Sequence, residues 1–116
     1  MSITESRLNL DAELANVLAS VNKPQNLYFQ PPESIRLKYP CIIYERSGGH
    51  TRFADNRPYF FEERYKITVI DRDPDNPTVR AIAMHFPKNH YDQHFVHDNL
   101  HHDVFTIYWH RNSKEE

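Results

Sequence analysis

Histidine is the residue type with the most evident chemical potential in this sequence of 116 residues. The chain has eight histidines, and six fall in one short stretch: His85, His90, His94, His97, His101 and His102. Imidazole is the commonest metal ligand in proteins, so zinc or nickel are the ions to consider. The stretch contains neither Cys nor Glu, which are the residues that would complete a familiar ligand set.

Two spacings decide whether these histidines can share an ion. His90 and His94 have the spacing of the zinc-protease helix motif, but Tyr91 stands where that motif needs Glu. On a strand, His90 and His94 would lie on one face about 13 Å apart, which is too far for a single ion. Across the expected turn, His97 and His101 are the remaining candidate pair. We expect no metal site, and we interpret these histidines as half-exposed residues of a hairpin.

Three aspartates at alternate positions resemble the start of a calcium-binding loop. Asp71, Asp73 and Asp75 match its first three ligands. The match then ends, because Asn76 stands where glycine is needed and Ile82 where the bidentate Glu belongs. We interpret the aspartates as groups that form hydrogen bonds within a turn at the end of a strand.

No residue pattern indicates a catalytic nucleophile or a phosphate-binding loop. Cys41 begins an apolar segment, where a thiol is usually an inert core group. Ser47 precedes Gly48 but lies in no Gly-x-Ser-x-Gly turn. The chain has only two glycines, which excludes glycine-rich phosphate loops. The sequence therefore predicts neither an enzyme nor a bound cofactor.

Composition narrows the class of protein further. With 14 basic and 16 acidic residues, the chain lacks the basic character of a dedicated nucleic-acid binder. Its apolar runs are far shorter than the roughly 20 residues that a membrane-spanning helix needs. The N-terminal residues show no signal peptide, and the single cysteine suits a reducing cytoplasm. Aromatic residues make up 13% of the chain, which favours an aromatic-rich sheet.

The first 40 residues predict one helix followed by an extended segment. Apolar residues at helical spacing predict a helix over about 5–22: Leu10, Leu14, Val17, Leu18 and Val21. Four prolines between residues 23 and 40 favour extended backbone there. We expect this proline-rich segment to lie across the domain or on a neighbouring subunit.

The remainder, 41–110, predicts four strands and a second helix. Residues 41–45 are apolar enough for a central strand, which we expect residues 47–50 to interrupt before an irregular connection or loosely paired hairpin arm. Residues 63–71 alternate as a strand does. Asn76 and Pro77 favour the start of a helix that ends before Pro87. The segments 90–97 and 100–110 predict a hairpin around the turn at Asp98 and Asn99.

These elements give the order α-β-β-α-β-β within a single domain that spans residues 1–116. The expected fold class is α+β, a two-layer sandwich in which two helices pack on one face of a four-stranded antiparallel or mixed sheet.

Seven short segments, in fixed order over about residues 26–109, resemble the neck proteins of long-tailed (siphovirus-type) bacteriophages. The segments are NLYFQPP (26–32), KYPCIIY (38–44), FADN (53–56), YKITVID (65–71), DPD (73–75), DNL (98–100) and VFTIY (104–108). In this order they are similar to the tail terminators, or tail-completion proteins. The histidine-rich hairpin departs from the family pattern, so the resemblance assigns those histidines no role.

The resemblance implies a structural virion protein whose α+β subunits form a hexameric ring. Such a ring caps the head-proximal end of the tail tube, stops tube polymerisation and provides the head–tail joining surface. The implied partners are other copies of the chain, the major tail tube protein and the head connector or stopper protein. DNA would pass through the lumen without sequence-specific binding, and no membrane is involved. The implied location is the tail neck of the virion, assembled in the host cytoplasm.

Expected exposure and polarity suggest two interface regions for a ring subunit. In the extended segment, Tyr28 and Phe29 would face a neighbouring subunit. In the connection 47–62, the polar residues Arg52, Asp55, Asn56 and Arg57 would face the tube or the lumen. Two alternatives stay open at this point. One is another neck component, a head–tail stopper or adaptor, and the other is a small histidine-rich metal-binding protein or enzyme.

Overall fold

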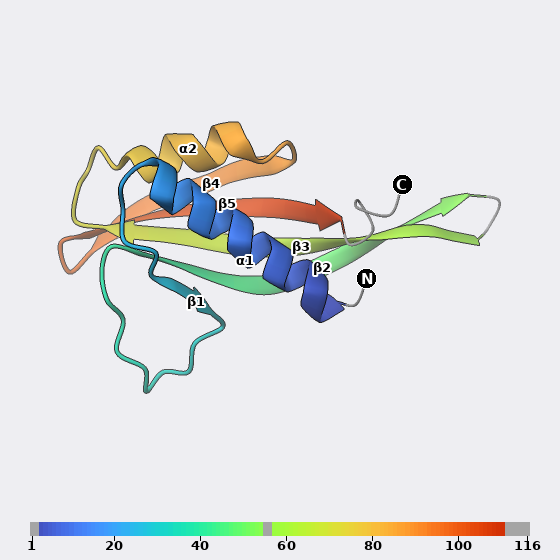
Figure 1. Ribbon diagram of the computed structural model, residues 1–116, viewed down its shortest axis with the longest axis horizontal. Coiled ribbons are helices and arrows are strands. Elements are labelled where there is room, and N and C mark those ends of the chain that lie inside the picture. Colours follow the sequence, from blue (N-terminus) through green and yellow to red (C-terminus); the bar gives the residue numbers. More distant parts are fainter. Residues whose placement is uncertain (1–2, 55–56, 111–116) are drawn as a thin grey trace.

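The computed structural model describes residues 3–54 and 57–110, with side chains described for 5–49, 51 and 62–109 (Figure 1). Two helices and five strands follow one another along the chain. They are α1 (Ile3–Ser20), β1 (Leu27–Phe29), β2 (Cys41–Ala54), β3 (Arg57–Asp71), α2 (Pro77–His85), β4 (Asn89–His97) and β5 (Leu100–His110).

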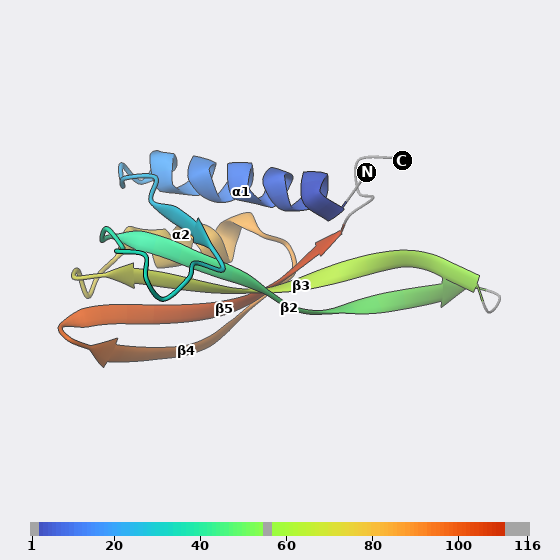
Figure 2. The same ribbon diagram turned by 90° about the horizontal axis from the view of Figure 1, so that it is seen from below.

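The strands form one mixed sheet in the order β1-β2-β3-β5-β4. β1 runs parallel to β2, and the other neighbouring strands are antiparallel. Both helices lie on the same side of this sheet (Figure 2). The predicted α+β class is therefore confirmed. The sheet has five strands rather than the four expected.

The additional strand, β1, comes from the proline-rich segment. Its residues are half-buried, and Leu27 is aligned with Ile42 of β2. The Ile42 N–H donates to the Asn26 carbonyl at 2.9 Å, and the Gln30 N–H donates to the Tyr44 carbonyl at 3.0 Å. A three-residue strand has too little pattern to be recognised in a sequence. It forms here because β2 offers a free edge to pair with.

The core lies between the helices and the helix-covered face of the sheet. The apolar stripe of α1 is buried at Leu10, Leu14, Val17 and Leu18 as its spacing predicts, and it packs with residues from three strands and α2. This cluster comprises Leu10, Leu14, Val17, Leu18, Ile42, Tyr44, Tyr65, Ile67, Val69, Ile82, Phe86, Phe105 and Ile107. The helix ends at Ser20 rather than at about residue 22, so Val21 lies beyond it and is half-buried. The expected N-cap of α2 is also present, because the Asn76 side chain accepts a hydrogen bond from the Thr78 N–H at 3.0 Å.

The β2–β3 hairpin differs from the sequence-based expectation. Residues 47–50 do not end the strand, and the connection expected over 47–62 is instead mostly paired strand. A bulge between Arg46 and Gly48 absorbs the extra residue, and Arg64 fixes it by donating from Nη2 to the Ser47 carbonyl at 2.9 Å. Since β5 pairs with β3 only from Glu62 onwards, the distal hairpin projects as a two-stranded arm (Figures 1 and 2).

Gly48→Ala is expected to destabilise the protein by about 1–3 kcal/mol, because Gly48 has φ +150°, a region that other residues rarely adopt. An added Cβ would also lie 2.5 Å from Nη2 of Arg64. The measurement is chemical denaturation. Gly49→Ala, one residue further along the same exposed strand, is the matched control and is expected to change stability less. Equal effects of the two substitutions would contradict a special role for Gly48.

Candidate functional site

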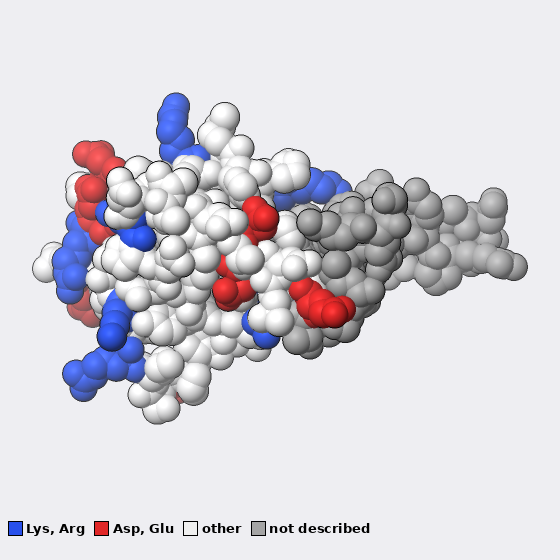
Figure 3. Space-filling view, viewed as in Figure 1, with Lys and Arg blue, Asp and Glu red and all other residues white. Residues whose placement is uncertain are grey.

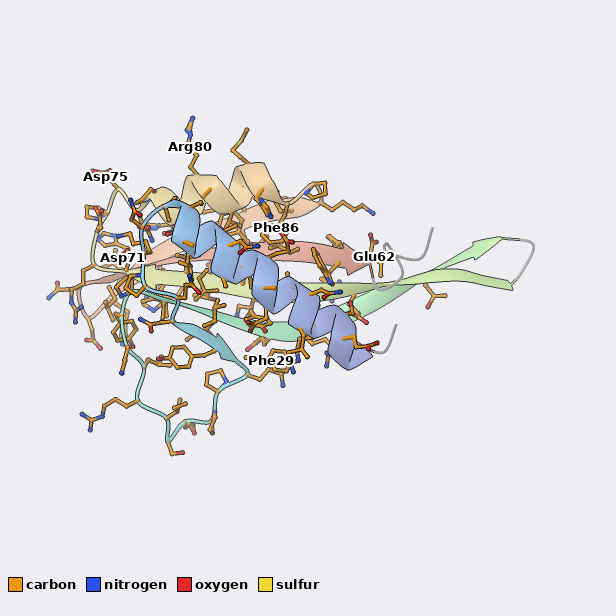
Figure 4. All side chains as sticks on the ribbon, viewed as in Figure 1. Phe29, Glu62, Asp71, Asp75, Arg80 and Phe86 are labelled. Atoms are coloured by element: carbon orange, nitrogen blue, oxygen red, sulfur yellow. The ribbon has the colours of Figure 1, made fainter. Side chains whose placement is uncertain are left out.

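A groove of about 700 Å³ lies between α2 and the β4–β5 hairpin. One wall is formed by the turn before α2 and by α2 itself, including Asp75, Val79 and Met84. The other wall is formed by strand residues, including His94 and Asp103. At its mouth, Arg80 points away from the sheet (Figure 4). The groove therefore combines apolar walls with a polar cluster on the strands.

Asp103 is the centre of that polar cluster. Its side chain is buried, and its Oδ1 accepts a hydrogen bond from the Tyr91 hydroxyl at 2.6 Å. This hydrogen bond, with a smaller effect of burial, raises the pKa of Tyr91 to about 12. The same Oδ1 lies 2.8 Å from Nδ1 of His94. On the other side of that ring, Nε2 of His94 lies 3.5 Å from Nδ1 of His101.

A bulge in β4 brings these groups to one face. Tyr91 is aligned with Phe105 and Gln93 with Val104, so Asp92 is an extra residue in β4. Beyond the bulge the alternation is shifted by one residue, and His94 lies on the helix-covered face with Asp103. The expectation that His90 and His94 share a face is therefore wrong. Strand periodicity alone carries no sign of such a bulge.

The candidate pair His97 and His101 is not brought together. His97 is aligned with Leu100 and His101 with Val96, so the two histidines lie on opposite faces of the hairpin. His97 instead lies 3.3 Å from the carboxylate of Asp98. Within the described residues, no group of three or more His, Cys, Asp or Glu side chains is placed to hold a metal ion. The pair that the fold does bring together is His94 and His101.

The aspartate turn and the cysteine have the structural surroundings expected of them. Asp71 accepts a hydrogen bond from the Asp73 N–H, and Asp73 accepts one from the Asp75 N–H. Asp71 also forms an ion pair with Lys23 at 2.9 Å. Cys41 is buried, and burial together with the negative charge of Asp71 raises its pKa to about 12. This environment disfavours the reactive thiolate.

Two of the predicted interface residues make contacts within the chain. The Tyr28 hydroxyl accepts a hydrogen bond from the Lys38 N–H at 3.1 Å. The Phe29 ring packs 5.1 Å from the Tyr44 ring, centroid to centroid, and lies beneath the guanidinium of Arg7. Both residues are half-buried by these contacts. Their role in an interface stays a prediction.

Of the other predicted interface residues, only the backbone of Arg52 and Arg57 is described, within the hairpin arm. Arg52 and Arg57 lie on β2 and β3, and their side chains are outside the described part of the structure. Asp55 and Asn56 lie outside the described residues. The arm itself projects beyond the helices (Figure 1). Lys, Arg, Asp and Glu side chains gather at the other end of the molecule on the face that Figure 3 shows.

Two surfaces lie at the outer edges of the sheet, and only the second falls in a segment, 23–40, that the sequence predicted as an interface. We name the first the β4 edge surface; its exposed apolar residues are Tyr91, Phe95 and Val96. Every residue of β4 after Asn89 is exposed. We name the second the β1-side surface, which comprises β1 and the segment 30–40 with exposed Ile35. The strand order that makes these two surfaces the edges could not be derived from strand lengths or alternation.

No helix in the described part of the chain is long and apolar enough to span a membrane. No protein-family model matches the sequence, and no curated protein matches it either.

Proposed function

We propose that this chain is a ring-forming structural protein of the neck of a long-tailed bacteriophage, a tail terminator that caps the head-proximal end of the tail tube. The proposal combines the ordered sequence resemblance over about residues 26–109 with two unlike sheet edges, β1 and β4, that have no further strand partner in the part of the chain that the structure describes. Of these two observations, the sheet edges are the structural one on which the proposal rests. Such a ring would stop tube polymerisation and offer its other side to the head connector.

The two edges have the geometry that a ring of identical subunits requires. A closed ring needs two different complementary patches on each subunit. β4 and β1 are the opposite ends of the strand order, so the patches lie on opposite sides of the subunit. An exposed edge strand with apolar side chains is a template for pairing with another chain. We therefore expect the β4 edge surface of one subunit to contact the β1-side surface of the next.

The β2–β3 arm is the element proposed to reach beyond the ring plane. It extends past β5, and among residues 3–54 and 57–110 its two strands are paired only with each other, as far as the alignment of Ala54 with Arg57. Outer strand edges that have no strand partner within the described residues suit a contact with the tube or with a second subunit. Arg52, Asp55, Asn56 and Arg57 retain their proposed role at this contact.

Light scattering at several protein concentrations, with and without purified tail tubes, tests the proposal. The expected result is a ring of defined mass, six subunits in the proposed form, or a monomer that joins into rings on tube ends. Added protein should also stop the growth of tubes from tube-protein monomers. A chain that stays monomeric, leaves tube growth unchanged and does not bind tube ends would contradict the proposal.

Another neck component, a stopper or adaptor, is the alternative within the same class. It shares the expectation of self-assembly through unlike edges, so the binding partner discriminates between the two. A terminator binds the isolated tube, whereas a stopper or adaptor binds the isolated connector. Binding to the connector alone would favour the alternative.

A further inference from the structure

We propose that His94 and His101 form a two-imidazole binding site for a divalent transition-metal ion such as Zn²⁺, Ni²⁺ or Cu²⁺. Asp103 is the positioning residue of this site. The site lies on the helix-covered face of the β4–β5 hairpin, where His94 lines the groove beside α2. It is independent of the proposed role in tail assembly.

The distance between the two nitrogens fits a shared ion. Nε2 of His94 and Nδ1 of His101 are 3.5 Å apart. Two imidazole nitrogens bound tetrahedrally to zinc, each about 2.0–2.1 Å from the ion, are roughly 3.4 Å from each other. The two rings are stacked at an interplanar angle of 28° with centroids 5.4 Å apart, so binding requires the rings to rotate until both lone pairs point at the ion.

Asp103 gives His94 the form that a metal ligand needs. When Nδ1–H of His94 donates to Oδ1 of Asp103, 2.8 Å away, the lone pair of that ring is on Nε2, which faces His101. His101 binds the ion through Nδ1 as the tautomer with its proton on Nε2. A carboxylate behind a ligating imidazole is the usual outer partner in metal sites. Asp103 is itself held by the Tyr91 hydroxyl at 2.6 Å.

The site is open on its outer side. The His94 side chain is 41% exposed, so an ion has access from solvent. Two protein ligands leave the remaining positions of the ion to water or to a donor from another molecule. Imidazole suits zinc, copper and nickel, whereas calcium and magnesium prefer oxygen ligands. The chemical class of the ligand is therefore a late divalent transition metal.

His90 provides a matched control within the same strand. Its Nδ1 lies 2.6 Å from the Asp92 carboxylate, so it has the same type of outer partner as His94. The bulge at Asp92 places His90 on the opposite face of the hairpin from His94 and His101. His90 and His94 therefore each have a carboxylate next to Nδ1, but only His94 has the imidazole of His101 next to its Nε2.

Calorimetric titration of the full chain with Zn²⁺ alone tests the site. The wild-type chain is expected to bind one Zn²⁺ with saturation, and His94→Gln and His101→Gln are each expected to weaken binding at least about tenfold. His90→Gln should bind like the wild type. Asp103→Asn should retain both ligands and bind roughly 10–100-fold more weakly.

Two calorimetric results would overturn the proposal: absence of stoichiometric Zn²⁺ binding, or binding by His94→Gln equal to that of the wild type. The second result would place the ion at other histidines of the chain. Circular dichroism of each variant verifies the fold. Should Asp103→Asn fail to fold, the His94→Gln and His101→Gln substitutions still decide the outcome. Electron paramagnetic resonance with Cu²⁺ gives a second readout, in which coupling to two imidazole nitrogens is expected and coupling to one would refute the pair.

Discussion

Phe105→Ala is expected to lower the free energy of unfolding by about 3–5 kcal/mol, because it removes a fully buried ring from the middle of the sheet. Phe105 lies on β5, aligned with Ile67 of β3 and with Tyr91 of β4. Its ring meets the Tyr91 ring edge to face at a centroid distance of 5.2 Å. The substitution would therefore leave a cavity between three strands that the surrounding structure fills only in part. Urea denaturation measures the loss.

Phe95→Ala is the matched control for Phe105→Ala. Phe95 lies on the neighbouring strand β4, and its ring stacks on His102 with a centroid distance of 4.6 Å. Because 41% of Phe95 is already exposed, truncation removes less area from the interior. We expect a loss of roughly 1 kcal/mol. If Phe95→Ala were as destabilising as Phe105→Ala, the assignment of the core to the helix-covered face would be wrong.

The parts of the fold that the sequence predicts are those with a long periodic pattern. The stripe of α1 and the terminal hairpin with its turn at Asp98 and Asn99 are both present, and the two turn residues have φ of 54° and 63°. Positive φ at both central positions is what a tight two-residue hairpin turn needs. β1 escaped prediction because a three-residue strand depends on a tertiary partner rather than on its own pattern.

The errors in the hairpins have a common physical cause. A bulge adds one residue to a strand and shifts the alternation, while pairing with the partner strand continues on both sides. The bulge before Gly48 allows β2 to continue where the two adjacent glycines had indicated the end of the strand. At Asp92 it moved His94 to the face of Asp103. The histidines of the candidate site were therefore evident from the sequence, whereas Asp103 was not, and the pairing of His94 with His101 depended on a bulge that the sequence did not reveal.

Val96→Lys is expected to weaken self-association at least about tenfold, which corresponds to ~1.4 kcal/mol. Val96 is 54% exposed on the β4 edge surface, and a lysine on an edge strand opposes pairing with another chain. Leu8→Lys is the matched control, because Leu8 is 52% exposed on α1 and belongs to neither proposed surface. Sedimentation or light scattering should find Val96→Lys dissociated at concentrations where the control assembles. Equal assembly of the two variants would exclude the β4 edge.

A mixture of Val96→Lys with Ile35→Lys distinguishes a head-to-tail ring from a symmetric dimer. Ile35 is 44% exposed on the β1-side surface, so each variant has one altered surface and one intact surface. In a head-to-tail arrangement neither variant forms rings alone, but the two together form a dimer through the intact pair of surfaces. If the β4 edge instead paired with itself, Ile35→Lys would assemble like the wild type and the mixture would contain no such heterodimer. The composition of the mixture therefore reports directly on whether two unlike edges make the interface.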